Sequence, residues 1–298
     1  MTKSVILPVQ DELSIKRRQI DDPAPVVNYL NQLNTLILTR HVILLMIEVQ
    51  KHRGASMAVL AGNREFAARV SQSQRIIHRY LEIIQQLNQQ AGMLISEDRW
   101  QSINHDWQAL IEHWQTDPVM TNFEFHNHFI DSMVKLIWEQ VCNAHLVAAA
   151  KPSEGTSRML LTITLKLMPE LLENIARVRG LATHVCSLGR SDAEFDSRFI
   201  SLLHALNINK EKMRTISKTL QHNTLRAVPS LPEILLHDHK LDQLQQTVGS
   251  KIIGVDGIEL SGKELFRFAS EVIESYAQVI HDGITYFRSR AERQLGTV

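Results

Sequence analysis

The sequence has little of what a disulfide-bonded extracellular scaffold or a nucleic-acid-binding protein requires. Its 298 residues include only two cysteines, Cys142 and Cys186, which stand far apart and in no CxxC pattern. Secreted disulfide scaffolds carry more cysteine, so a reducing compartment is expected and the chain is predicted to be cytoplasmic. Lysine plus arginine number 32, as do aspartate plus glutamate. Without a basic excess, direct binding to nucleic acid is not expected.

Glycine and proline are also scarce, at 12 and 8 residues. Strand signals are almost absent, the exception being a short piece at residues 252–260. The N-terminus has no long apolar run and so does not read as a secretory signal. The most apolar stretch, residues 36–49, is interrupted by Arg40 and Glu48, whereas a membrane span needs roughly 18 uninterrupted apolar residues. We therefore expect an all-α protein that does not enter a membrane.

Apolar periodicity predicts about eight helices. They cover approximately residues 26–61, 64–90, 97–114, 118–144, 157–188, 192–225, 232–247 and 262–293. Residues 1–25 carry three prolines and are expected to form a flexible arm. The segment 151–155 is the clearest linker, and it divides the rest of the chain into halves at about 26–150 and 156–294. Four helices in each half predict two antiparallel four-helix bundles.

Local signals refine these helices. Ser191 with Glu194, and Ser261 with Glu264, have the spacing of capping boxes, and Asp117 is expected to cap the helix that starts at Pro118. Three tryptophans recur on one face of the third helix and are interpreted as core residues rather than a cofactor site. The inward stripe of the fourth helix is expected to be Phe125, Phe129, Met133, Leu136, Val141 and Ala144.

Each half places an Arg-Gly pair inside a long apolar helix. Arg53-Gly54 is followed by Ser56, and Arg179-Gly180 is followed by Thr183. Glycine costs about 1 kcal/mol relative to alanine inside a helix, so its recurrence indicates a close approach by another helix or a small ligand. Neither arginine has an acid on its own helical face. By contrast Arg177 has Glu173 four residues earlier, and we interpret it as a surface ion pair.

An arginine on an apolar face must find an anion elsewhere, because an unpaired buried charge costs several kcal/mol. One source is a carboxylate from another helix, such as Glu48, Asp131 or Glu139. The other is a bound small anion, which the repeated glycines and adjacent hydroxyls favour. The two arginines would then grip the anion from two helices, with Ser56, Thr183 or backbone N–H groups completing the site.

The stretch Gln50-Lys51-His52-Arg53-Gly54-Ala55-Ser56 resembles the Q-K-x-R-G-x-S signature in the first helix of nitrate- and nitrite-sensing (NIT) domains. Residues 173–180 are similar to that family's second Arg-Gly helix, and the closing helix from Ser261 is similar to its last helix. The resemblance covers most of residues 26–293. It implies a helical sensor domain over residues 26–298 that binds nitrate or nitrite through Arg53, Gly54, Ser56, Arg179, Gly180 and Thr183.

The resemblance also implies signalling by helix displacement to an output module, which in this family is an antiterminator, a histidine kinase, a cyclic-nucleotide enzyme or a chemoreceptor tail. Only Leu295-Gly296-Thr297-Val298 remain beyond residue 294, so the output is expected to be a separate partner or to belong to a longer chain. Homodimerisation is a further expectation, because outputs of this kind usually work in pairs.

Two other functional classes were weighed. An enzyme would need a nucleophile, base or metal cluster, and the pairs His126/His128 and His237/His239 lack the i, i+4 spacing of a helical zinc site. They are interpreted as surface or capping residues, so no catalytic residue, metal or cofactor is predicted. The stronger rival is a helical interaction scaffold without a small ligand, in which carboxylates satisfy both Arg53 and Arg179.

Overall fold

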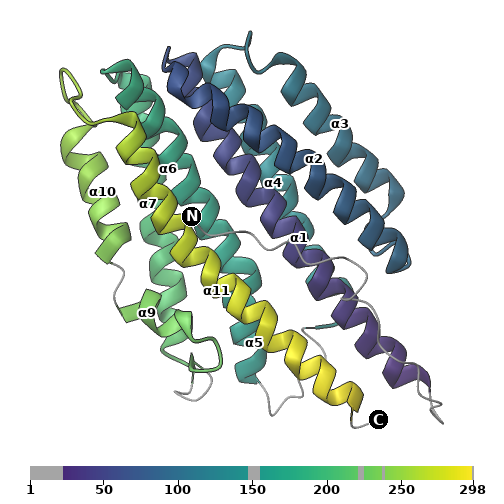
Figure 1. Ribbon diagram of the computed structural model, residues 1–298. Helices are drawn as coiled ribbons and strands as arrows, with labels where there is room; N and C mark the ends of the chain where they lie inside the picture. The colour runs from purple at the N-terminus through teal and green to yellow at the C-terminus, as the bar shows by residue number, and fades with distance from the viewer. Residues whose placement is uncertain (1–22, 147–154, 221–224, 237–238, 297–298) are drawn as a thin grey trace.

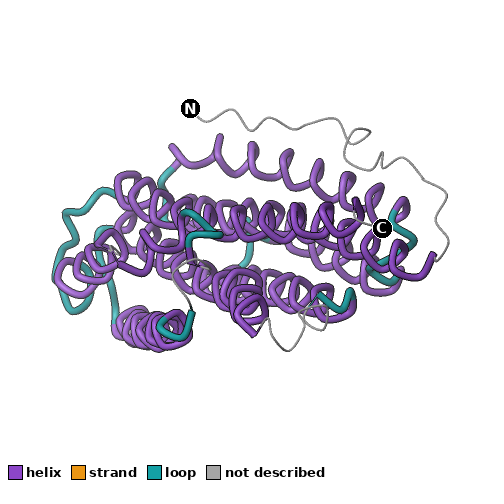
Figure 2. The backbone as a smooth tube through the Cα atoms, turned by 90° about the horizontal axis from the view of Figure 1, so that it is seen from below, coloured by secondary structure: helices purple, strands orange, loops and turns teal. Residues whose placement is uncertain are grey.

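The computed structural model describes residues 23–146, 155–220, 225–236 and 239–296, and within these ranges the fold is all-α, as predicted (Figure 1; Figure 2). The helices are α1 (Pro23–Leu60), η2 (Arg64–Phe66), α2 (Ala67–Gln90), α3 (Glu97–His113), α4 (Val119–Asn143), α5 (Gly155–Thr162), the π-helical turn η4 (Ile163–Leu167), α6 (Met168–Leu188), α7 (Ala193–Ser217), α9 (Ser230–Leu236), α10 (His239–Lys251) and α11 (Gly262–Gly296). The expected arm lies almost wholly outside the described residues, although α1 already begins at Pro23.

Helix α1 is the centre of the molecule. It is 38 residues long and apolar on nearly all sides, a pattern that predicts burial all round. It packs on α2 and α4 from its own half and on α6 and α11 from the other half. By length and composition its residues 27–60 are long and apolar enough to cross a membrane, yet 72% of that apolar window is buried inside the fold.

The two halves are joined by one core. The larger of two apolar clusters runs through the helices of both halves, with α2 and α3 on one flank of the molecule and α7, α9 and α10 on the other (Figure 1). The expected arrangement as two antiparallel four-helix bundles is not confirmed, because the helices of both halves share this cluster. The reason is that α1 and α6 are apolar on several faces, so each buries surface against the other half as well as against its own.

Helices α1 and α6 lie side by side and run in the same direction. Three hydrogen bonds join α1 and the residues just after it to α6, and residue numbers increase on both sides in the same direction: Gln50 to Glu173, Met57 to His184, and Asn63 to Ser187. Helix α4 runs antiparallel along α1, and α11 runs antiparallel along α6. The pairs α1/α4 and α6/α11 are thus arranged alike in the two halves.

Several local predictions were wrong. Phe125 is 54% exposed, and the aromatic residue that α4 directs inward is its neighbour Phe123. Helix α4 starts after Pro118 without a side-chain cap from Asp117. Helix α7 is capped by Asp192, whose carboxylate accepts the N–H groups of residues 194 and 195, while Ser191 donates to Asp196 instead.

The C-terminal half also differs in its boundaries. Helix α7 ends at Ser217 rather than near residue 225, and the predicted helix 232–247 is two helices, α9 and α10. Residues 252–260 contain no strand. They form a loop whose buried Ile258 donates its N–H to the carbonyl of Gly189, 2.8 Å away. The expected linker at 151–155 lies outside the described residues except for Gly155, which begins α5.

A glycine in the middle of α11 sets how closely it approaches the second half's central helix. A Cβ placed on Gly283 would lie 2.6 Å from Cγ2 and 2.7 Å from Cβ of Thr164, within the π-helical turn. We expect Gly283→Ala to lower the free energy of unfolding by about 1–3 kcal/mol through overpacking. Urea unfolding would measure this. Gly249→Ala in α10, where the added Cβ meets nothing within 4 Å, is the control and should be neutral or stabilising by up to about 1 kcal/mol.

Candidate functional site

The two Arg-Gly pairs meet at the contact between α1 and α6. Both arginine side chains are fully buried, with 0% of their surface exposed. The glycines are reciprocal: a Cβ on Gly54 would lie 3.6 Å from Nε of Arg179, and a Cβ on Gly180 would lie 3.6 Å from Nε of Arg53. Those separations are ordinary contacts, and the closest neighbours of the two Cβ positions are Phe266 Cε2, 2.9 Å from that of Gly54, and Met57 Sδ, 3.3 Å from that of Gly180. Each glycine therefore lets side chains of the neighbouring helices pack closely on its own helix beside the arginines, which is the local reason for its place in the helix interior.

Each arginine is covered by an aromatic ring from the antiparallel neighbour helix. The guanidinium carbon of Arg53 lies 5.4 Å from the ring centre of Phe123, and that of Arg179 lies 4.8 Å from the ring centre of Phe266. Four residues beyond each ring, a polar side chain accepts a hydrogen bond from the same arginine. Asn127 Oδ1 accepts from Arg53 Nη1 at 2.6 Å, and Ser270 Oγ accepts from Arg179 Nη1 at 3.0 Å.

Sequence reasoning missed these four covering residues. The signal that could have found them is an aromatic residue followed four positions later by a small polar residue, present in both α4 and α11. A spacing of four places two side chains on one helix face. Since such pairs are common in helices, the signal gains meaning only beside the duplicated Arg-Gly sites.

Arg53 has a buried carboxylate partner. Its Nη1 lies 2.6 Å from Oε1 of Glu173, and its Nη2 lies 3.2 Å from Oε2. Gln50 donates to the same Oε2 at 2.8 Å. The sequence analysis named other acids as candidate partners and assigned Glu173 to Arg177 alone. That assignment was incomplete, because Glu173 projects between α6 and α1.

Arg177 is more than a surface residue, contrary to the sequence interpretation. Its Nε donates to Oε1 of Glu173 at 2.7 Å, and its Nη2 donates to Oδ1 of Asp131 at 2.6 Å, with 21% of its side chain exposed. Arg53, Glu173, Arg177 and Arg179 are called the arginine cluster below. At the edge of this cluster the charge of Arg177 is balanced by that of Asp131, which lies outside the cluster. Inside the cluster the charges of Arg53 and Glu173 balance each other.

Arg179 is the unbalanced member of the cluster. No carboxylate among the described residues forms an ion pair with it, and its Nε and Nη2 have no hydrogen-bond partner. Burial, followed by the nearby charge of Arg53, lowers the pKa of Arg179 from 12.5 to about 9. The buried interior between α1 and α6 therefore carries one excess positive charge.

The two hydroxyls expected to complete an anion site donate to the backbone of their own helices. Ser56 Oγ lies 3.0 Å from the carbonyl oxygen of Arg53, and Thr183 Oγ1 lies 2.7 Å from that of Arg179. Such bonds to a carbonyl three or four residues earlier occupy the hydroxyl proton. An anion in the cluster would therefore find its donors on the guanidinium groups.

A buried histidine pair lies beside the cluster. His126, which the sequence analysis placed at the surface, is fully buried with its ring 5.1 Å from that of His52. His126 Nδ1 donates to the carbonyl of Asn122 at 2.8 Å, so its Nε2 is free to accept from Nδ1 of His52, also at 2.8 Å. Gln74 then donates to Nε2 of His52 at 3.2 Å. Every bond in this chain is satisfied when both rings are neutral.

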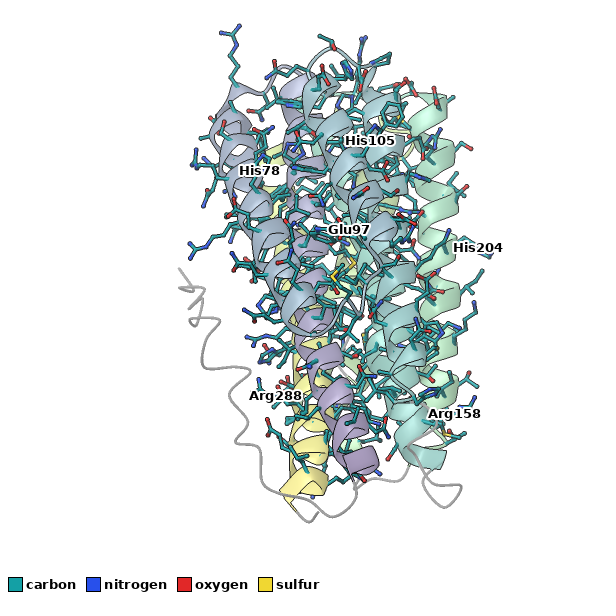
Figure 3. All side chains as sticks on the ribbon, turned by 90° about the vertical axis from the view of Figure 1, so that its right-hand side faces the viewer. His78, Glu97, His105, Arg158, His204 and Arg288 are labelled. Atoms are coloured by element: carbon teal, nitrogen blue, oxygen red, sulfur yellow. The ribbon has the colours of Figure 1, made fainter. Side chains whose placement is uncertain are left out.

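The other histidines considered from the sequence behave as expected where the structure describes them. His128 and His239 are exposed, and His237 lies outside the described residues. His105 on α3 and His204 on α7 point to solvent from the outer helices (Figure 3). In the described part of the chain, no group of three or more His, Cys, Asp or Glu side chains is placed to hold a metal ion.

Comparisons with protein-family models, with curated proteins and with solved structures find no match to this chain. The likeness to NIT domains therefore depends only on the two short Arg-Gly motifs and the closing helix of the sequence.

Proposed function

We propose that this protein senses a small planar monoanion, nitrate or nitrite in the first place, which binds between α1 and α6. The observation that supports this most is the buried, unpaired guanidinium of Arg179. A lone charge in a protein interior costs several kcal/mol. A bound anion would remove this cost, which gives the folded protein a reason to take one up.

The free edge of Arg179 suits such a ligand. Nε and Nη2 lie side by side on the guanidinium and present two parallel N–H groups, the fork with which arginine binds planar oxyanions. Arg53 also has an unsatisfied N–H, at its Nε. Three N–H groups from two helices are thus available to a ligand with three oxygens in one plane.

Binding would require movement of the helices. Since neither arginine has any exposed surface, an anion can reach them only when packing around the cluster opens. The covering rings of Phe123 and Phe266 belong to α4 and α11, so these are the helices expected to shift. A ligand that binds the opened form better than the closed form shifts the population towards it. The shift would pass along α11 to an output partner or a second copy of the chain in the cytoplasm.

One observation favours the rival function, an interaction scaffold. Arg53 already has a bidentate carboxylate partner in Glu173, as a purely structural arginine would. The scaffold gives no account of Arg179, which has aromatic cover and one hydroxyl but no ion-pair partner among the described residues. The anion sensor accounts for both arginines and is therefore preferred.

Calorimetric titration with sodium nitrate, with sodium chloride at matched ionic strength, tests the proposal. We expect saturable nitrate binding that Arg179→Ala weakens by at least about 100-fold, because two charge-assisted hydrogen bonds are lost. Arg53→Ala should weaken it as well. Arg267→Ala is the matched control, since Arg267 follows Phe266 on α11 but is 72% exposed; its affinity should equal that of the unmodified protein.

Absence of nitrate and nitrite binding up to millimolar concentration would remove the sensor function and leave the scaffold. Binding that survives in both Arg179→Ala and Arg53→Ala would keep a sensor but place its site elsewhere.

A further inference from the structure

Glu173 occupies the place of an anion in the arginine cluster. A carboxylate is a planar oxyanion, and both of its oxygens accept from Arg53. We propose that Glu173 is a built-in competitor that limits the site to one added negative charge, so that it takes monoanions and rejects dianions such as sulfate. This inference rests on the proposed function and concerns which anions the same site selects.

The charges of the buried groups carry the argument. Arg53 and Arg179 are both 0% exposed, and Glu173 is 2% exposed. Glu173 pairs with Arg53, and the other buried acid whose charge acts on Arg179, Glu48, pairs with Lys51. The interior therefore keeps one excess positive charge, which one further negative charge would neutralise. A dianion would leave an uncompensated negative charge out of water, a strongly unfavourable state.

Only the second half has an acid at the position of Glu173, the residue proposed to select monoanions. Glu173 stands six positions before Arg179, and the residue six positions before Arg53 is Ile47. Because α1 and α6 present their arginines in similar surroundings, an acid at both positions would place a carboxylate beside each guanidinium group. An acid in one half alone leaves one guanidinium for an external ligand.

Glu173 also has partners that it can keep if an anion takes its place on Arg53. Oε1, which accepts from Arg53 Nη1, accepts from Arg177 Nε as well, and Oε2, which accepts from Arg53 Nη2, accepts from Gln50 as well. Arg177, with Phe123 and Asn127, lines a pocket of about 260 Å³ that opens to solvent between α4 and α7. Phe123 and Asn127 contact Arg53, so this pocket brings solvent to the side chains that cover the cluster.

Glu173→Gln tests the inference, because it removes the charge and keeps the shape. We would measure binding of sodium nitrate and sodium sulfate to both proteins by calorimetry at matched ionic strength. The unmodified protein should bind nitrate and not sulfate. In Glu173→Gln we expect sulfate binding to appear and the preference for nitrate over sulfate to fall at least about tenfold, since one nearby negative charge is gone.

Asp131→Asn is the control, because it removes an equal charge from the cluster's edge, where Asp131 is 47% exposed; its anion preference should not change. If Glu173→Gln does not fold, Arg53→Met/Glu173→Met keeps the buried excess at one positive charge. This double variant should retain the preference for nitrate over sulfate, and binding of sulfate by it would overturn the inference.

The outcomes separate this inference from the proposed function. If the unmodified protein binds nitrate and Glu173→Gln keeps the same preference, the function stands and the role of Glu173 is wrong. If the unmodified protein binds neither anion while Glu173→Gln binds sulfate, the sensor function fails and the competitor role stands. If neither protein binds either anion, both proposals are overturned.

Discussion

Arg179→Met is expected to raise the thermal unfolding temperature of the anion-free protein, whereas Arg53→Met is expected to lower it. Lowering the pKa of Arg179 from 12.5 to about 9 corresponds to a penalty on its charged form on the order of 5 kcal/mol. Methionine removes that charge and keeps most of the volume. The hydrogen bond to Ser270 and the contact with Phe266 are lost, so a net gain of about 1–3 kcal/mol, or a few degrees, remains.

Arg53→Met has the opposite sign because Arg53 is paired. Its removal leaves the buried carboxylate of Glu173 with only Arg177 and Gln50. Breaking a buried ion pair from one side costs on the order of 3 kcal/mol. The two arginines have the same burial and similar aromatic cover, so the difference in sign isolates the effect of the counter-charge.

Differential scanning calorimetry in a buffer free of nitrate, nitrite and other small oxyanions would measure both variants. A drop in unfolding temperature for Arg179→Met as large as that for Arg53→Met would mean that Arg179 stabilises the fold. An interaction scaffold would then explain Arg179 better than an anion sensor does. Added nitrate should stabilise the unmodified protein in proportion to its binding and leave Arg179→Met unchanged.

Acid is expected to destabilise the protein from just below pH 6.5. Burial lowers the pKa of His52 from 6.5 to about 3, and burial together with the neighbouring His52 holds the pKa of His126 well below 6.5. In this window the unfolded chain binds more protons than the folded one, so stability rises with pH and falls as pH falls. Well below pH 6.5 the slope approaches about 1.4 kcal/mol per pH unit for each histidine whose ring stays neutral in the folded protein.

Urea unfolding at pH 7.5, 6.5, 5.75 and 5 would give this slope. His52→Gln should reduce it by about 1.4 kcal/mol per pH unit, because one titrating ring is gone while His126 stays. The control is His204→Gln on the exposed face of α7 (Figure 3), which should leave the slope unchanged. An equal slope in His52→Gln and the unmodified protein would show that His52 is already protonated, or accessible to water, in the folded state.

Much of the fold follows from local pattern. Apolar residues at three- and four-residue spacing, with few glycines and prolines, specify the all-α class and bring most helices within a few residues of their observed bounds. One of the wrong local predictions arises where two neighbouring residues could both cap the same helix. Ser191 and Asp192 are both good caps, and only the folded structure shows that Asp192 caps α7 while Ser191 binds Asp196.

What the sequence by itself determined is the existence of two Arg-Gly sites in apolar helices, since burial and the absence of an acid on the same face are properties of one helix. The tertiary structure alone decided which charges meet. Arg53 and its partner Glu173 are 120 residues apart, and they meet because α1 and α6 run parallel and close, a result of packing over the whole core. Electrostatic pairing depends on distance in space, which helical periodicity does not encode, and so the unpaired charge of Arg179 became visible only in the folded protein.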